Sequence, residues 1–390
     1  FCALRGAVYD GHDFVARAAA AGAVAALVEE SVPDATIPQL LVSDSRAATA
    51  IDASPVVGDP ADALSLVGIT GTNGKTTTAL ITRHVLAASG PAAAVGTLGW
   101  YDTHGDRHPG RLTTPDPLDL MATLHDLRSE GTRFVAMEVS SHALDQRRVA
   151  GLTFEAGVFT NLSREHLDYH PDMASYRSAK ILLARQVTED GTCVVNADDP
   201  AWLNADYSGR RVVRYGLSVQ ADVRAAEVRH TPSGSDWNLV TTQGSWPVHL
   251  PLLGEFNVHN ALAAAAAAGS LGMPPALVVE RLAEAPQVPG RMEILSRRPV
   301  LVLRDYMHTP DAYVRVLGAL RELTSGRLLI VFGCGGDRDR GKRPIMGGIA
   351  AEMADFALIT TDNPRTEDPA AICSDIVRDM ATQSYRIVLD

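Results

Sequence analysis

The sequence predicts an α/β protein with a central P-loop domain on a parallel sheet and a Rossmann-like domain near its C-terminal end. Three observations lead to this class. A strand, a glycine-rich loop and a helix pattern follow one another over residues 64–88. Strands and helices alternate again after residue 290, and 390 residues are enough for two or three domains of roughly 100–200 residues each.

The start of the chain is expected to form a small α/β domain. A helix-like pattern covers residues 14–22, and short apolar strands follow at 25–28 and 39–42. Residues 55–60 contain one glycine and two prolines, a composition typical of a linker. We therefore place the first domain at residues 1–58.

Residues 59–290 are expected to form the central domain. A strand at residues 64–70 runs into the glycine-rich loop and a helix at 76–88 follows, which is the context that a P-loop requires. Polar residues crowd the C-terminal ends of two later strands, and in parallel sheets ligands bind at that edge. These strands lie at 134–137 and 157–160, antiparallel hairpins are expected within 223–250, and a helix at 258–271 closes the domain.

The pair Pro289-Gly290 marks the next boundary. Residues 291–390 alternate between strand and helix patterns, which predicts a Rossmann-like third domain. The expected strands lie at 299–304, 328–332, 356–360 and 386–389, and the expected helices at 310–323 and 344–353.

The composition is that of a soluble globular protein. Hydrophobic residues make up 46% of the chain and charged residues 21%. The net charge of −11 argues against unspecific nucleic-acid binding, which needs a basic footprint, but a nucleotide can still be held locally. No apolar run approaches the ~20 residues of a membrane span, and four widely spaced cysteines suggest neither a zinc site nor a disulfide framework. We expect a cytoplasmic protein that needs no membrane and acts as a monomer.

The glycine-rich loop predicts phosphate binding. A strict Walker A pattern needs a glycine where the chain has Ile69, so the pattern is met only in its second half. Lysine is rare here, and we expect Lys75 to reach nucleotide phosphates as a point charge and Thr76 to bind Mg²⁺. The only three lysines, against 32 arginines among 35 basic residues, are Lys75, Lys180 and Lys342. The loop residues expected at the nucleotide are Gly71, Thr72, Asn73, Gly74, Lys75, Thr76 and Thr77.

Four longer motifs stand out along the chain. They are Gly71-Thr-Asn-Gly-Lys-Thr-Thr77, Leu112-Thr-Thr-Pro-Asp116, Glu138-Val-Ser-Ser-His-Ala-Leu-Asp-Gln146 and Phe159-Thr-Asn-Leu-Ser-Arg-Glu-His-Leu-Asp168. Together they resemble the Mur ligases of peptidoglycan synthesis, and the likeness runs from Phe1 to Arg365. The resemblance implies the three-domain Mur ligase architecture, with a UDP-substrate domain, a central ATP domain and an amino-acid domain.

The resemblance also implies an ATP-dependent amide ligase. ATP would phosphorylate the free carboxylate of UDP-MurNAc-L-Ala-D-Glu, and the amine of the incoming amino acid would then displace phosphate. Two anions must meet in the first step, which calls for two Mg²⁺ ions. The metal-binding residues implied are Thr76, Glu138, His166 and Lys180, and the catalytic residues are Lys75, Lys180, His166 and Glu138. Lys180, which would otherwise be a helix-surface lysine, matches a lysine that the family carries as a carbamate.

The remaining site residues are carried over from the same family. For the UDP-dipeptide they are Thr113, Thr114, Ser140, Gln146 and Arg148. For ATP they are Asn257, His259, Asn260, Arg291, Asp305 and His308, and Met307 departs from the alanine usual at its place.

For the amino acid they are Arg338 and the four residues Asp362, Asn363, Pro364 and Arg365. This tetrapeptide matches the family's meso-diaminopimelate motif. The chemistry agrees, because diaminopimelate has a distal carboxylate that lysine lacks and an arginine can bind that carboxylate through two hydrogen bonds.

Three alternatives stay open at this point: a lysine-adding ligase, a relative recruited to a peptide natural product, and a non-catalytic ATP-binding relative. The family carries an upstream Asp-Ser-Arg segment and a downstream Gly-Lys-Gly-His-Glu segment that do not occur here at their expected places. We therefore expect the first and last domains to be truncated.

Overall fold

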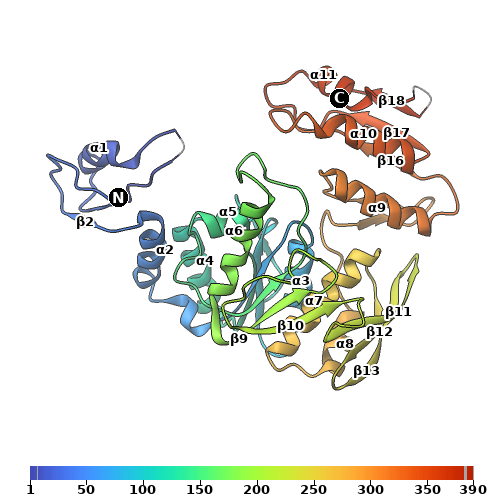
Figure 1. The fold of residues 1–390 in the computed structure, drawn as a ribbon, viewed down its shortest axis with the longest axis horizontal. Helices are drawn as coiled ribbons and strands as arrows, with labels where there is room; N and C mark the ends of the chain where they lie inside the picture. Colours follow the sequence, from blue (N-terminus) through green and yellow to red (C-terminus); the bar gives the residue numbers. More distant parts are fainter. Residues whose placement is uncertain (7, 382–383, 390) are drawn as a thin grey trace. The chain divides into compact units, whose positions relative to one another are not determined.

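The fold is described from a computed structural model that covers residues 1–6, 8–381 and 384–389 (Figure 1). The chain divides into two compact units. Unit 1 comprises Phe1–Val223 and Ala263–Val278, and unit 2 comprises Arg224–Leu262 and Val279–Asp390. Among the described residues, no helix is long and apolar enough to span a membrane.

Unit 1 is organised around a mostly parallel sheet with β3 (Ser65–Thr70) near its centre. The strand order is β10-β9-β8-β3-β7-β4-β5-β6, parallel from β10 to β4, with β5 and β6 added antiparallel. The central strands are buried apolar runs, as expected for strands covered on both faces. Their bounds are β4 Ala92–Gly96, β5 Gly99–Tyr101, β6 Arg107–His108, β7 Phe134–Glu138, β8 Phe154–Phe159, β9 Val187–Asn196 and β10 Arg211–Gly216.

Helices α3 to α6 pack along this sheet (Figure 1). The predicted strand and helix around the P-loop are confirmed as β3 and α3 (Lys75–Leu86). The hydroxyl of Ser140 caps α5 by accepting a hydrogen bond from the Ala143 N–H at 3.1 Å. The other helices of this layer are α4 Pro117–Ser129, α5 Ser141–Asp145 and α6 Met173–Arg185. We did not predict α4, β9 or β10.

The first residues form a small substructure with its own apolar cluster. Its two strands, β1 (Ala26–Val28) and β2 (Gln39–Leu41), lie where strands were predicted, and they pair in parallel. Its helical segments are η1 Gly11–Phe14, α1 Val15–Ala20 and α2 Ser45–Val56.

The predicted linker at 55–60 is wrong. Pro55 lies in the last turn of α2, Gly58 follows the helix with φ 77°, and Pro60 begins the 3-10 helix η2 (Pro60–Ala63). A proline near the end of a helix removes a hydrogen bond where the helix is about to stop anyway. These residues therefore mark a helix end rather than an extended connection.

Unit 2 begins with the predicted antiparallel hairpins. Strands β11 (Val223–Thr231), β12 (Gly234–Thr241) and β13 (Gly244–Leu250) pair in sequence order. Helices α7 (Glu255–Ser270) and α8 (Pro275–Ala283) follow along the chain, and residues 263–278 of this stretch belong to unit 1. We did not predict α8.

The end of the chain carries a three-stranded parallel sheet. Its order is β16-β17-β18, and its core includes Tyr313, Phe332, Ile359 and Ile376. The strands are β16 Leu329–Phe332, β17 Phe356–Thr360 and β18 Tyr385–Val388, and the helices are α9 Pro310–Leu323, α10 Lys342–Met353 and α11 Pro369–Val377.

The predicted strand at 299–304 does not belong to that sheet. Only its second half forms a strand, β15 (Val302–Arg304), which pairs antiparallel with β14 (Glu293–Ser296). Arg304 lies opposite Glu293 and donates two hydrogen bonds to its carboxylate, at 2.7 and 2.9 Å. This cross-strand pair favours the hairpin over addition to the parallel sheet.

Leu66 offers a test of the core of unit 1. It lies on β3 and is 1% exposed, so Leu66→Ala should lower the free energy of unfolding by about 2–5 kcal/mol. Urea and thermal unfolding would measure the change. Leu118→Ala on α4 is the matched control, because Leu118 is 62% exposed and its truncation should change stability by less than about 0.5 kcal/mol.

Candidate functional site

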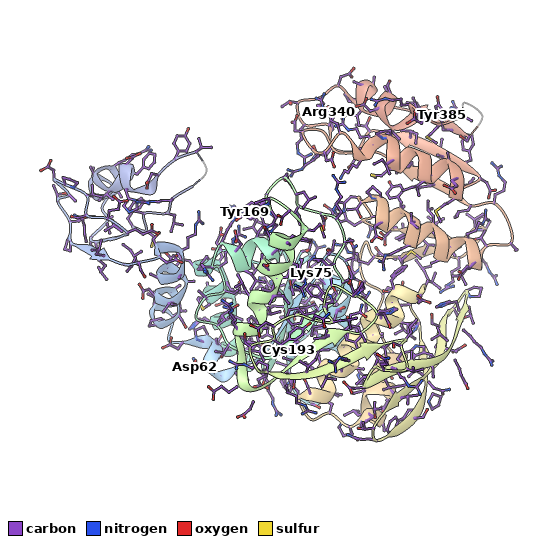
Figure 2. All side chains as sticks on the ribbon, viewed as in Figure 1. Asp62, Lys75, Tyr169, Cys193, Arg340 and Tyr385 are labelled. Atoms are coloured by element: carbon purple, nitrogen blue, oxygen red, sulfur yellow. The ribbon has the colours of Figure 1, made fainter. Side chains whose placement is uncertain are left out.

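The glycine loop connects β3 to α3 through a conformation that only glycine adopts easily. Gly71 has φ 145°, and a Cβ there would lie 1.8 Å from the Thr160 hydroxyl. Lys75 stands at the head of α3 (Figure 2) and its Nζ donates hydrogen bonds to the carbonyls of Gly71, at 3.0 Å, and Thr72, at 2.8 Å. The amine and the first N–H groups of α3 therefore concentrate positive charge at this loop.

Lys180 reaches the same loop from α6. Its side chain is 1% exposed, so it is not an ordinary helix-surface lysine. Its Nζ donates to the Gly71 carbonyl at 2.7 Å and lies 4.4 Å from the centre of the Tyr176 ring. Burial, and then the neighbouring charge of Lys75, holds the pKa of Lys180 well below its ordinary value. Burial therefore disfavours the charged form of this amine.

His166 lies beside the two lysines on the loop after β8. Its backbone is left-handed, with φ 55°, which is uncommon outside glycine and occurs at functional sites. Burial lowers the pKa of His166, and the charges of Lys75 and Lys180 lower it further against the opposing effect of Glu165.

Two further histidines surround His166, and we did not predict them. The rings of His142 and His166 are 4.7 Å apart, and those of His142 and His170 are 5.6 Å apart. Burial lowers the pKa of His142 to about 4. His142 lies inside the Glu138-to-Gln146 motif, so the sequence did contain a signal for it.

Glu138 ends β7, beside the P-loop strand. It is 1% exposed and pairs across the sheet with Ile69, two residues before Gly71. Its carboxylate accepts hydrogen bonds from the Thr97 N–H, at 2.8 Å, and the Thr97 hydroxyl, at 3.1 Å. The predicted proximity of this carboxylate to the P-loop therefore follows from strand register.

The five residues expected at the UDP-dipeptide form one hydrogen-bonded chain that includes Glu138. The Thr113 and Thr97 hydroxyls are 3.0 Å apart, and the Thr114 hydroxyl donates to the Glu138 carbonyl at 2.9 Å. The Ser140 N–H donates to the Thr114 hydroxyl at 3.0 Å.

Arg148 completes that chain. It donates to the Thr114 carbonyl at 3.1 Å and to the Gln146 side-chain oxygen at 2.8 Å. The fold thus gathers hydroxyl, amide and guanidinium groups along the edge that follows β7.

Two of the residues expected to bind metal suit Mg²⁺ by their chemistry. Among the described residues, no three His, Cys, Asp or Glu side chains converge tightly enough to hold an ion by themselves. Mg²⁺ does not need such a cage, because it usually keeps several waters and binds one or two carboxylates together with substrate phosphates. Glu138 and the Thr76 hydroxyl, both buried near the P-loop, suit that mode.

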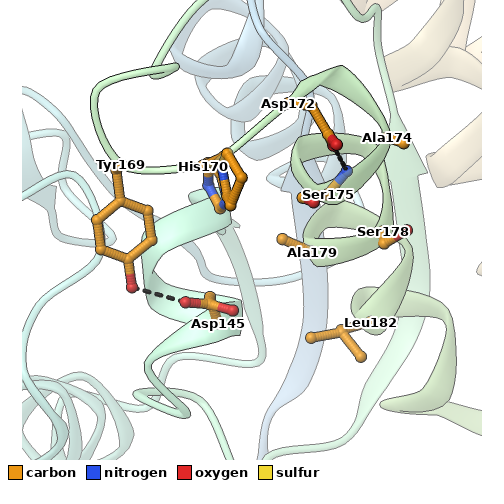
Figure 3. Close-up of a pocket in the computed structure, with 10 residues that line it drawn as sticks. Asp145, Tyr169, His170, Asp172, Ala174, Ser175, Ser178, Ala179 and Leu182 are labelled. Atoms are coloured by element: carbon orange, nitrogen blue, oxygen red, sulfur yellow. Dashed lines mark hydrogen bonds between the residues drawn. The ribbon is translucent and has the colours of Figure 1, made fainter.

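A pocket of about 680 Å³ lies beside this site, between the end of α5 and the start of α6 (Figure 3). It contains none of the predicted site residues. At its wall the Tyr169 hydroxyl donates to the Asp145 carboxylate at 2.6 Å, and the Gln146 amide contacts the same hydroxyl at 3.3 Å. The lining residues are Asp145, Tyr169, His170, Pro171, Asp172, Ala174, Ser175, Ser178, Ala179 and Leu182.

Three residues expected at the nucleotide lie close together in unit 2. The Asp305 carboxylate accepts from the Met292 N–H at 2.7 Å, and burial raises the pKa of Asp305. The Arg291 guanidinium lies 4.9 Å from the centre of the Tyr306 ring, and the Tyr306 carbonyl lies 3.0 Å from His308 Nδ1.

Lys342, whose role the sequence left open, donates from Nζ to the His308 carbonyl at 2.9 Å. It therefore connects the start of α10 to this nucleotide-side motif.

The asparagines of α7 point into the protein. Asn257 is 2% exposed and donates to the Leu253 carbonyl at 2.8 Å, and Asn260 donates to Asn257 at 3.0 Å. His259 is half-buried, and its Nδ1 lies 3.2 Å from the Glu255 carbonyl. Met307 packs against the apolar core at the end of the chain.

The two loops expected at the amino acid lie against each other in unit 2. They are loop A, residues 333–339, which carries Arg338, and loop B, residues 362–367, which carries the Asp362-to-Arg365 motif. The Gly336 N–H donates to the Asn363 carbonyl at 2.8 Å, and Arg338 and Arg365 are both exposed. The fold therefore brings both predicted arginines to one place.

Comparison with known proteins gives consistent matches over nearly the whole chain. Residues 69–268 match the model of the Mur ligase middle domain, and residues 290–390 match that of the Mur ligase, glutamate ligase domain. A protein of Geobacter metallireducens named UDP-N-acetylmuramoyl-L-alanyl-D-glutamate--2,6-diaminopimelate ligase is 45% identical, over 99% of this chain and 78% of its own length.

Solved structures agree with these matches. A structure of a ligase of the same name superposes with a TM-score of 0.73 at 35% identity, over 97% of this chain and 79% of the other. A MurF ligase from Thermotoga maritima in complex with ADP shares the fold, with a TM-score of 0.67 at 19% identity over 100% of this chain and 90% of the other.

Replacing the buried Lys180 amine should stabilise the protein. The pKa of Lys180 is lower in the folded chain than in the unfolded chain, so charging this lysine opposes folding. Lys180→Met should therefore raise the free energy of unfolding at pH 7, because methionine fills a similar volume and carries no charge.

This increase in the free energy of unfolding should be largest at low pH, where the wild-type lysine is charged in the folded chain. It should shrink as pH rises above the folded-state pKa of Lys180 and vanish near the ordinary lysine pKa of about 10.4. Urea unfolding of both proteins between pH 6 and 10, in buffer free of carbon dioxide, measures it. A gain that does not change with pH would contradict this account.

Proposed function

This chain belongs to the Mur ligase family, and we propose that it joins meso-diaminopimelate to UDP-MurNAc-L-Ala-D-Glu in an ATP-dependent step of peptidoglycan synthesis. One observation carries the choice of amino acid. Arg365, in the Asp-Asn-Pro-Arg loop, and Arg338 lie exposed on two loops that contact each other. An arginine there supplies a bidentate partner for the carboxylate that distinguishes diaminopimelate from lysine.

The reaction consists of two displacements. An oxygen of the D-glutamyl carboxylate attacks the γ-phosphorus of ATP, which gives an acyl phosphate and ADP. The neutral amine of the amino acid then attacks the acyl carbon, phosphate leaves, and the nitrogen loses a proton to form the amide. The first step brings two anions together, so the protein must lower their repulsion.

The P-loop supplies that electrostatic help in our proposal. Lys75 is a charged amine at the head of α3, and it can turn from the loop carbonyls to the phosphates through rotation of its own side chain. The first N–H groups of α3 point at the same place. The chain from Thr113 to Arg148 would orient the UDP-dipeptide along the neighbouring edge.

Magnesium, when bound, would neutralise phosphate charge and align the reacting groups. Thr76, Glu138 and His166 would hold it, together with Lys180 as a carbamate. Only a neutral amine adds to carbon dioxide, and the depressed pKa of Lys180 favours that form. The addition releases one proton and turns a potential cation into an anion, which arginine is unable to reproduce. We place this chemistry in the cytoplasm, where ATP is available.

The carbamate proposal is tested at Lys180. Lys180→Arg should abolish activity, because a guanidinium keeps its charge and does not form a carbamate. Lys180→Ala should be inactive alone and partly rescued by small carboxylates such as acetate, which can occupy the space of the missing carbamate. The measurement is phosphate release with ATP, Mg²⁺, UDP-MurNAc-L-Ala-D-Glu and meso-diaminopimelate, and full activity of the arginine variant would refute the role.

The amino-acid assignment is tested at Arg365. The wild-type enzyme should use meso-diaminopimelate far better than lysine. Arg365→Ala should lower kcat/KM for diaminopimelate by roughly 10- to 100-fold, the value of a charge-assisted hydrogen bond, and change kcat/KM for lysine little. Arg315→Ala on α9 is the matched control, since Arg315 is an exposed arginine paired only with Asp311 among the contacts described.

A wild-type protein that prefers lysine would indicate the lysine-adding alternative. A protein that uses neither amino acid would indicate a recruited or non-catalytic relative.

A further inference from the structure

The two arginine-bearing loops of unit 2 are connected by a buried ion-pair network that lies behind them. Its centre is Arg343, on the first turn of α10, whose side chain is 1% exposed. Arginine is rarely buried without a partner. Arg343 donates two hydrogen bonds to the Glu367 carboxylate, at 2.8 and 3.0 Å, and one to Asp375 on α11, at 3.0 Å.

Glu367 connects the buried Arg343 to both loops. It is the last residue of loop B, and its N–H donates to the Pro364 carbonyl at 2.9 Å, which closes the turn that carries Arg365. Its carboxylate also accepts from the Asp337 N–H of loop A at 2.6 Å. The hydrogen bonds from Arg343, followed by that backbone contact, lower the pKa of Glu367 to about 2. The carboxylate therefore stays charged throughout the pH range of an enzyme assay.

The loops also bind each other directly. The Asp337 carboxylate accepts from the Thr366 hydroxyl at 2.8 Å and from the Thr366 N–H at 3.1 Å. Arg365 donates from its guanidinium to the Gly336 carbonyl, so one end of this arginine is already held by loop A. A Cβ at Gly336 would lie 1.9 Å from the Pro364 carbonyl oxygen, so only glycine permits this approach.

The backbone of Arg365 needs such support. Its φ of 50° is left-handed, a conformation that costs on the order of 1–3 kcal/mol in a residue other than glycine and persists only when the surroundings impose it. The surroundings here are loop A, the Glu367 turn and the buried Arg343. A loosened loop B would return Arg365 to a more favourable backbone and move its guanidinium.

We propose that Arg343 and Glu367 are positioning residues that set amino-acid specificity by holding Arg338 and Arg365 in one fixed arrangement. This inference rests on the proposed function. Recognition of a carboxylate by an arginine fork depends on geometry, and a site loosened by about 1 Å loses much of its discrimination. Diaminopimelate, whose distal carboxylate needs the fork, should be affected more than lysine, which has none.

The test compares two isosteric substitutions, each of which removes one carboxylate from Arg343. Glu367→Gln replaces the charged acceptor of Arg343 and of the Asp337 N–H with a neutral amide, which weakens the ion pair that anchors the two loops. Asp375→Asn is the matched control, because Asp375 lies on α11 and its described contacts are to Arg343 and Arg378. Thr366→Val, an exposed position, removes a loop contact with little risk to folding. Readouts are KM for each substrate, the kcat/KM ratio of meso-diaminopimelate to lysine, and the thermal midpoint.

Glu367→Gln should raise KM for diaminopimelate about tenfold or more and lower the ratio by a similar factor, with KM for ATP and the UDP-dipeptide within about twofold of wild type. Thr366→Val should lower the ratio in the same direction. Asp375→Asn should leave the ratio unchanged, even where it lowers the thermal midpoint as much as Glu367→Gln does. The double variant Glu367→Gln/Arg365→Ala should have the ratio of Arg365→Ala alone, because Glu367 acts through Arg365.

An unchanged ratio in both Glu367→Gln and Thr366→Val overturns the inference, as does an equal loss toward all three substrates. The parallel wild-type assay separates this failure from failure of the proposed function. A wild type that does not use diaminopimelate rejects the function, whereas an active, selective wild type with unaltered variants rejects only the positioning role.

Discussion

Two lysine amines donate to a single backbone carbonyl, that of Gly71, and the central site depends on this arrangement. Two charged ammonium groups so close together in a buried place would repel strongly. The arrangement is stable because the fold divides their roles. Lys75 stands at a helix start facing the phosphate loop, whereas Lys180 is enclosed by α6 and the Tyr176 ring and tends toward the neutral form. In the proposed reaction, Lys75 would therefore act through its charge, and Lys180 would act as a nucleophile toward carbon dioxide.

In unit 1, the register of the parallel sheet brings the proposed site residues together. β3, β7 and β8 are adjacent and parallel, so the residues that follow them meet at one edge. The phosphate loop follows β3, Glu138 ends β7, and His166 follows β8. Unit 2 uses a different device, because the two arginines proposed to recognise the amino acid are exposed while the buried Arg343 holds their loops through side-chain hydrogen bonds. Strand register thus places the proposed catalytic groups, and a side-chain network places the proposed specificity groups.

Local patterns predicted the parts whose geometry is local. Short-range periodicity and turn residues predicted the strand and helix around Lys75, the hairpins of unit 2 and the bounds of α9. The long motifs predicted the family and the reaction. Contacts between residues far apart in the chain could not be predicted from the sequence. Lys180 bonds to a carbonyl 109 residues away, so its burial had no local signature. Arg343 was passed over because arginine is usually exposed. The strand at β15 was misplaced because its pairing with β14 depends on tertiary context that strand and helix alternation does not encode.

Left-handed backbone at His166 and Arg365 has an evolutionary consequence. Glycine would relax both positions at little steric cost, so a population selected for heat resistance alone should drift toward it. Each such gain in robustness would remove an imidazole or a guanidinium. The imidazole at one point and the guanidinium at the other are therefore held at the expense of thermal endurance.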